Sequence, residues 1–140
     1  MGTHTFKMDG FKAIELIDIY MSIDLKDTEE WVSPKVNINE DAPNRCMATC
    51  GYTGWTLGTF TGEYDTEGYP IFTNHVVLDG GYLAYIDWME LDNHITFCLS
   101  NYHCGCCPVK HVKIVGIENP DKDGEVFLYL KEKSDENKEG

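Results

Sequence analysis

The C-terminal half of the chain alternates apolar and polar residues with a period of two, and this pattern constrains the fold more than any other feature of the sequence. Residues 70–78 and 82–90 are rich in aromatic and β-branched side chains, and Asp79-Gly80-Gly81 separates the two runs. Such a pattern predicts two strands joined by a tight hairpin turn.

Further strands follow in the same half of the chain. Leu91-Asp92-Asn93 predicts a turn into a strand at 94–100, and residues 119–124 form a turn cluster between strands near 109–117 and 125–132. We therefore expect an antiparallel meander with a cysteine-rich loop between its third and fourth strands. The core should contain the apolar residues that share strand faces, namely Ile95, Phe97, Leu99, Val126, Leu128 and Leu130.

The N-terminal half carries weaker signals. Residues 17–26 alternate and predict a strand, and 36–39 predict a shorter one. Residues 51–63, rich in glycine and threonine, suit either a strand pair or an ordered loop, and 11–16 allow a short helical turn. The predicted class is mainly β, or α+β with a short N-terminal helix. With 140 residues, we expect one globular domain over 1–131 and a disordered polar tail over 132–140.

The net charge is −13, from 11 Lys and Arg against 24 Asp and Glu. Neither Lys nor Arg occurs between Arg45 and Lys110. This balance argues against direct binding to nucleic acid or to an anionic membrane. The acidic residues either form a solvated surface or form a face that docks on a basic groove. The candidate partner-binding residues are Glu63, Asp65, Glu67, Asp87, Glu90 and Asp92.

Six cysteines carry the most specific chemical signal. Cys46 and Cys50 form a C-x3-C pair, and Cys104 and Cys107 form a C-x2-C pair. Two close pairs far apart in sequence are how a tetrahedral zinc site is commonly assembled, because each short spacing directs two thiolates at one ion. We therefore predict a structural zinc site with these four ligands, joining the middle segment to the loop between two strands.

Alternatives to this ligand set stay open. Cys106 or His103 can replace one ligand of the second pair, and one pair can be a redox dithiol instead. Cys98 lies mid-strand on the face opposite Phe97 and fits the core better than a metal site. The other histidines have no paired spacing.

Enzyme signatures are largely missing from the sequence. It contains no Gly-rich phosphate loop, H-E-x-x-H, G-x-S-x-G or zinc-deaminase pattern. We therefore expect a protein without enzymatic activity. Neither a signal peptide nor a stretch of transmembrane length is visible, and the chain is predicted to be cytoplasmic.

Three functions fit these observations. The first is a small acidic inhibitor of a basic, nucleic-acid-handling host protein, in which carboxylates stand in for phosphates and aromatic side chains add apolar anchors. The second is a structural zinc-binding module of a larger assembly, and the third is a zinc-dependent or thiol-dependent enzyme. The expected anchors of the inhibitor are Trp55, Tyr64, Tyr69, Tyr82, Tyr85 and Trp88.

In its small size, acidity, single domain and cysteine pairs, the chain resembles phage-encoded anti-CRISPR proteins, in particular a zinc-containing inhibitor of type II Cas9. The resemblance covers overall character and no alignable segment. It implies direct binding to Cas9 in the bacterial cytoplasm and a block on DNA binding or cleavage. It also implies that the cysteines are candidate metal ligands.

Overall fold

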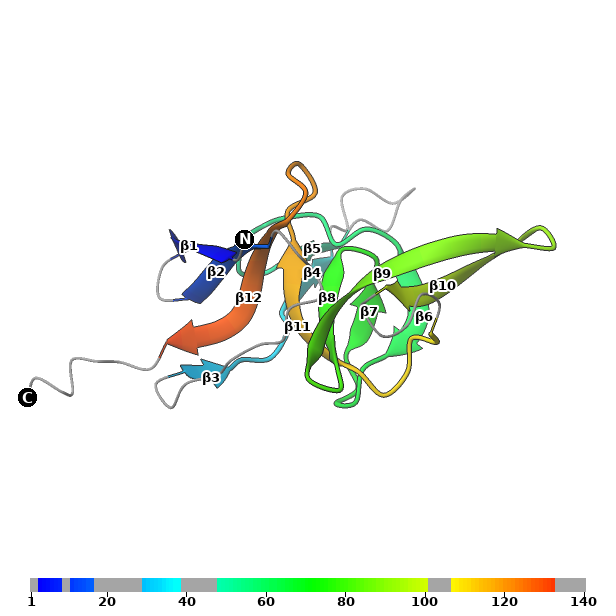
Figure 1. Cartoon of the computed structure of the whole chain (residues 1–140), viewed down its shortest axis with the longest axis horizontal. Helices are drawn as coiled ribbons and strands as arrows, with labels where there is room; N and C mark the ends of the chain where they lie inside the picture. The colour runs from blue at the N-terminus through cyan, green and yellow to red at the C-terminus, as the bar shows by residue number, and fades with distance from the viewer. Residues whose placement is uncertain (1–2, 9–10, 17–28, 39–47, 101–106, 133–140) are drawn as a thin grey trace, which may run out of the picture.

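The structure is a computed structural model, and it describes residues 3–8, 11–16, 29–38, 48–100 and 107–132. These residues form antiparallel strands and no helix. This arrangement confirms the mainly β class, and residues 11–16 form a strand in place of the helical turn that the sequence also allowed. Figure 1 shows the strands following one another along the long axis of the molecule, from β1 and β2 at one end to the β9–β10 hairpin at the other.

One large sheet organises the described part of the chain. Its strands, in spatial order, are β1 (Thr3–Met8), β2 (Phe11–Leu16), β12 (Glu125–Glu132), β11 (Lys113–Glu118), β8 (His75–Asp79), β9 (Tyr82–Leu91) and β10 (His94–Ser100), and β3 (Glu29–Trp31) also pairs with β12. Two smaller sheets pair β4 (Val36–Ile38) with β5 (Ala48–Cys50), and β6 (Phe60–Tyr64) with β7 (Pro70–Phe72).

The connection after β10 differs from the predicted meander. Strands β8, β9 and β10 follow one another as hairpins, but β11 returns to pair with β8 and not with β10. The spatial order β11-β8-β9-β10 is that of a Greek key. Local periodicity cannot distinguish the two connections, because both place the same residues on the same faces. Because β11 lies beside β8, β10 is the last strand of the large sheet.

Two hairpin turns have the predicted positions and a shared geometry. Gly80 and Gly81 join β8 to β9, and Asp92 and Asn93 join β9 to β10, all with positive φ between 51° and 99°. A two-residue loop with both φ values positive matches the right-handed twist of the flanking strands. Glycine, asparagine and aspartate tolerate this conformation best. The turn residues alone therefore set the register of β9 against both neighbours.

Most of the predicted strands are present. The expected strand at 94–100 is β10, and the short one near 36–39 is β4. The run at 70–78 divides into β7 and β8, because Thr73 and Asn74 form a turn between them. The expected strand at 17–26 and nearly all of the expected polar tail lie outside the described residues.

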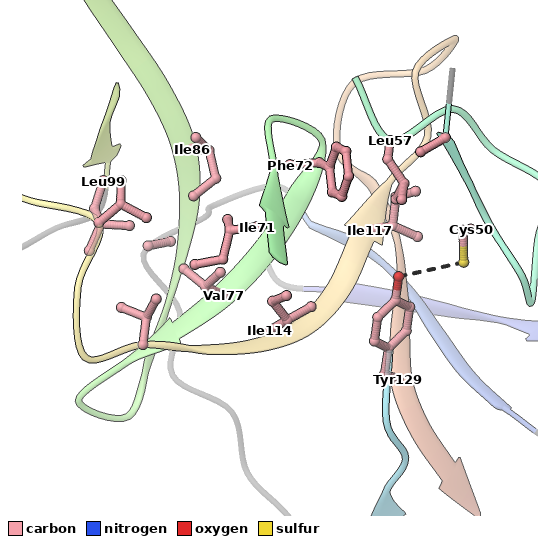
Figure 2. Close-up of a cluster of buried hydrophobic side chains, with 14 of the residues drawn as sticks. Cys50, Leu57, Ile71, Phe72, Val77, Ile86, Leu99, Ile114, Ile117 and Tyr129 are labelled. Atoms are coloured by element: carbon pink, nitrogen blue, oxygen red, sulfur yellow. Dashed lines mark hydrogen bonds between the residues drawn. The ribbon is translucent and has the colours of Figure 1, made fainter. Parts of the chain in front are cut away.

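The centre of the large sheet is buried on both faces. On one face, Val77, Ile114 and Tyr129 belong to a cluster that extends to Cys50 and Leu99 (Figure 2). On the other face, Val126, Leu128 and Leu130 are buried as predicted, together with Val76, Leu83 and Val115. Leu99 is also buried, but Ile95 is exposed, so only the end of β10 near Leu99 belongs to the core.

Candidate functional site

The β9–β10 hairpin extends past the rest of the sheet. Strand β8 pairs with β9 only as far as Tyr85, whereas β9 and β10 remain paired from Tyr85–Ser100 to Leu91–His94. Figure 1 shows the resulting two-stranded ribbon projecting beyond the other strands. We call residues 87–98 the arm. It starts next to Ile86 and Leu99, which are buried in the core.

One face of the arm continues the apolar face of the core into solvent. Trp88 pairs with Phe97, and Glu90 pairs with Ile95, on the same face as Ile86 and Leu99. The side chain of Trp88 is 58% exposed and that of Ile95 is 61% exposed. The expectation that Ile95 lies in the core is therefore wrong. Ile95 shares a face with Phe97 and Leu99 as predicted, but no described element covers this end of the strand.

The arm is acidic and contains neither Lys nor Arg. Asp87, Glu90 and Asp92 are all exposed, with Asp92 in the turn at the tip. Asp87 lies on the face opposite Trp88, and its carboxylate accepts a hydrogen bond from the Trp88 backbone N–H at 2.8 Å. The structure thus gathers half of the six predicted partner-binding carboxylates on one projecting element.

The other three predicted carboxylates lie elsewhere. Glu63 is half-buried on β6, and Glu67 is exposed but forms an ion pair with Lys113 at 3.1 Å. Asp65 is buried, with 6% of its surface exposed. It is therefore not available at the surface, which corrects its assignment as a partner-binding residue.

Asp65 instead connects two parts of the structure. Its Oδ1 accepts hydrogen bonds from the backbone N–H groups of Glu67 and Tyr69, both at 2.9 Å, and its Oδ2 accepts one from Ile114 at 3.1 Å. The first two bonds close the turn between β6 and β7, and the third links that turn to β11. A buried carboxylate is tolerated because these donors compensate for its lost hydration.

His75 is the other buried polar residue, with 1% exposed. The Phe72 backbone N–H donates to its Nδ1 at 3.0 Å, so the ring proton must lie on Nε2. Nε2 has no hydrogen-bond partner within the described part of the chain. Burial lowers the pKa of His75 to about 3, against a smaller opposing effect of Asp65. The ring is neutral at physiological pH and acts as a structural acceptor.

Only two of the four predicted zinc ligands lie among the described residues. Cys50, on β5, is fully buried as a reduced thiol, and the Tyr129 hydroxyl donates to its sulfur at 3.5 Å. Burial is the main cause that raises the pKa of Tyr129. Cys107 is half-buried and disulfide-bonded. Cys46 and Cys104 lie outside the described residues, as do the alternatives His103 and Cys106.

The structure does not bring Cys50 and Cys107 together. The Cys107 carbonyl accepts a hydrogen bond from the Leu99 N–H at 2.8 Å. Leu99 and Cys50 lie at opposite ends of the buried cluster in Figure 2. Within the ranges that the structure describes, no group of three or more His, Cys, Asp or Glu side chains is placed to hold a metal ion. Cys98 is a buried reduced thiol, as expected for a core residue.

The predicted aromatic anchors divide into exposed and covered residues. Trp88 and Tyr64 are 58% and 56% exposed. The other four are partly buried, and Trp55, Tyr69 and Tyr85 pack against the core clusters. Sequence analysis missed Phe60, which is 41% exposed and whose ring lies 5.6 Å from that of Tyr64. The alternation of residues 60–64 resembles that of any half-buried strand, so no sequence signal distinguished Phe60.

Comparison with protein-family models, with curated proteins and with solved structures found no match to this chain. Within the described ranges, no helix has the length and hydropathy needed to cross a membrane. Functional inference for this protein therefore depends on its own surface chemistry, of which the arm is the most distinctive part.

Proposed function

We propose that the protein is a non-enzymatic inhibitor that binds a basic surface of a nucleic-acid-handling protein, with the arm as its main contact. The observation that supports this most is the composition of the arm. It presents exposed Trp88 and Ile95 next to exposed carboxylates and carries neither Lys nor Arg. An exposed aromatic anchor with a polar rim is typical of protein-binding sites.

Charge also indicates what kind of partner the arm accepts. A second copy of this chain would place Asp87, Glu90 and Asp92 against acidic residues, in a protein of net charge −13. Like charges at an interface cost several kcal/mol. A cationic groove that normally holds nucleic acid offers the complementary charge. A type II Cas9 is the candidate that the sequence resemblance supplies.

Reversing charge on the arm is expected to weaken this interaction. The double variant Glu90→Lys/Asp92→Lys should bind Cas9 at least about tenfold more weakly and lose inhibition of DNA cleavage, because the new cations face a basic surface. The measurement is affinity by biolayer interferometry, together with a cleavage assay. The matched control is Asp121→Lys/Asp123→Lys, which makes the same charge change on exposed residues of the β11–β12 turn. Equal behaviour of the two variants would contradict the proposal.

The zinc site remains a separate proposal with its own test. If the two cysteine pairs share one ion, reduced protein should contain about one zinc per chain, and Cys46→Ser and Cys104→Ser should each abolish binding. The structure has Cys50 as a buried thiol and Cys107 in a disulfide, and a sulfur in a disulfide has no thiolate to donate. Metal analysis with and without reductant therefore decides between these two arrangements of the same cysteines.

A further inference from the structure

One edge of the arm, at Ile95 and Phe97, pairs with no described segment of the chain. Strand β10 is the last strand of the large sheet, and the Leu99 N–H points away from β9, since it donates to the Cys107 carbonyl. Backbone groups alternate in direction along an antiparallel strand. The N–H and C=O groups of Phe97 and Ile95 therefore also point away from β9. No other described segment forms hydrogen bonds with them.

The opposite edge of the arm is protected at Trp88. On β9, the Trp88 N–H points away from β10, but the Asp87 carboxylate accepts its hydrogen bond at 2.8 Å. Charged side chains placed this way keep a strand edge from pairing with another chain. At Ile95 and Phe97, strand β10 has no protection within the described part of the chain. His94–Ser100 contains neither Lys nor Pro, and its register with β9 runs without a bulge.

We propose that the arm binds its partner by strand addition, in which an extended segment of the partner pairs with β10 at Ile95 and Phe97. This inference rests on the proposed function, because it specifies how the same arm contacts a basic protein. The face of the added strand next to Phe97 and Ile95 takes apolar side chains. On its other face the added strand lies beside Thr96, and Lys or Arg side chains there reach across β10 toward Asp87 on β9. The expected partner segment therefore alternates apolar and basic residues.

The test uses a short fluorescent peptide of alternating valine and lysine, and the same peptide N-methylated at every residue. N-methylation retains the side chains and the charge but removes the amide donors. Binding to the full chain is measured by fluorescence anisotropy. Loss of the backbone hydrogen bonds at the β10 edge should weaken binding about tenfold or more. Equal binding of the two peptides, or no binding of the unmodified one, would overturn strand addition.

Two variants of the protein test the same β10 edge. Ile95→Pro removes an N–H that faces away from β9, and proline is tolerated at such edge positions. Ile95→Ala removes the same side chain but retains the N–H, and circular dichroism confirms that both variants fold. Ile95→Pro should bind the peptide markedly more weakly than Ile95→Ala, and equal binding would reject the proposal. A dimer of the protein that Ile95→Pro disrupts would assign the edge to a second copy and also reject it.

The outcomes separate the two proposals. If charge reversal at Glu90 and Asp92 abolishes Cas9 binding while the backbone changes have no effect on peptide binding, the proposed function stands and strand addition fails. If charge reversal has no effect on Cas9 binding, the proposed function itself fails, whatever the peptide does.

Discussion

Replacing Asp65 with asparagine is expected to lower the free energy of unfolding by about 2–3 kcal/mol. The carboxylate accepts three backbone hydrogen bonds in a buried position. Asparagine retains one acceptor oxygen and turns an amide donor toward a backbone N–H. At least one buried donor then loses its partner, and hydrogen bonds to a charged acceptor are replaced by weaker neutral ones.

Urea denaturation followed by tryptophan fluorescence measures this loss. The matched control is Asp92→Asn, because Asp92 is exposed and its φ of 51° is one that asparagine also adopts readily. The control should change stability by less than about 0.5 kcal/mol. If Asp65→Asn were as stable as this control, Asp65 would not have the linking role that its contacts indicate.

Acid is expected to destabilise the fold through His75. The pKa of His75 is lowered to about 3 in the folded protein, against an ordinary value of 6.5 for histidine. A group with a lowered folded pKa binds its proton more tightly in the unfolded chain. Its stabilising contribution is therefore complete above pH 6.5 and decreases as the pH falls from 6.5 toward 3. The expected slope is about 1.4 kcal/mol per pH unit.

The His75→Asn variant isolates this contribution. The asparagine Oδ1 can accept the Phe72 N–H as Nδ1 does, but asparagine does not titrate. The variant should be less stable at pH 8, since it fills less of the core, yet lose less stability than the parent protein between about pH 6 and pH 4. Urea midpoints across this range give the comparison. Parallel pH profiles would show that another group is responsible.

The two acidic residues Asp65 and Asp87 illustrate why a charge pattern does not identify a binding surface. Both lie in the stretch without Lys or Arg, and both follow an aromatic or apolar residue in a strand-like sequence. Asp65 is covered because β11 passes next to the β6–β7 turn, whereas Asp87 lies on the exposed arm. Ile114 of β11, which contacts Asp65, is 49 positions away in the sequence, so local composition contains no information about this burial.

The cysteine pairs likewise show that local spacing does not determine a metal site. The spacing of Cys46–Cys50 and Cys104–Cys107 indicates which thiols are close within each pair, because a few residues of chain restrict their separation. Whether the two pairs meet depends on the path of the strands between them. In this structure, the return of β11 to β8 leaves Cys50 and Cys107 at different ends of the core.

The sequence by itself determined most strands of the C-terminal half, their faces and the two-residue turns, because alternation and positive φ preferences act over a few neighbouring residues. Val126, Leu128 and Leu130 are buried as predicted for this reason. Only the tertiary structure decided that β11 pairs with β8, that Asp65 is covered and that Ile95 is exposed. An alternation with a period of two shows which side chains share a face. Burial of that face requires another element to pack on it. Beyond Phe97, which still packs against the core cluster, no described element does so, and Trp88 and Ile95 are exposed.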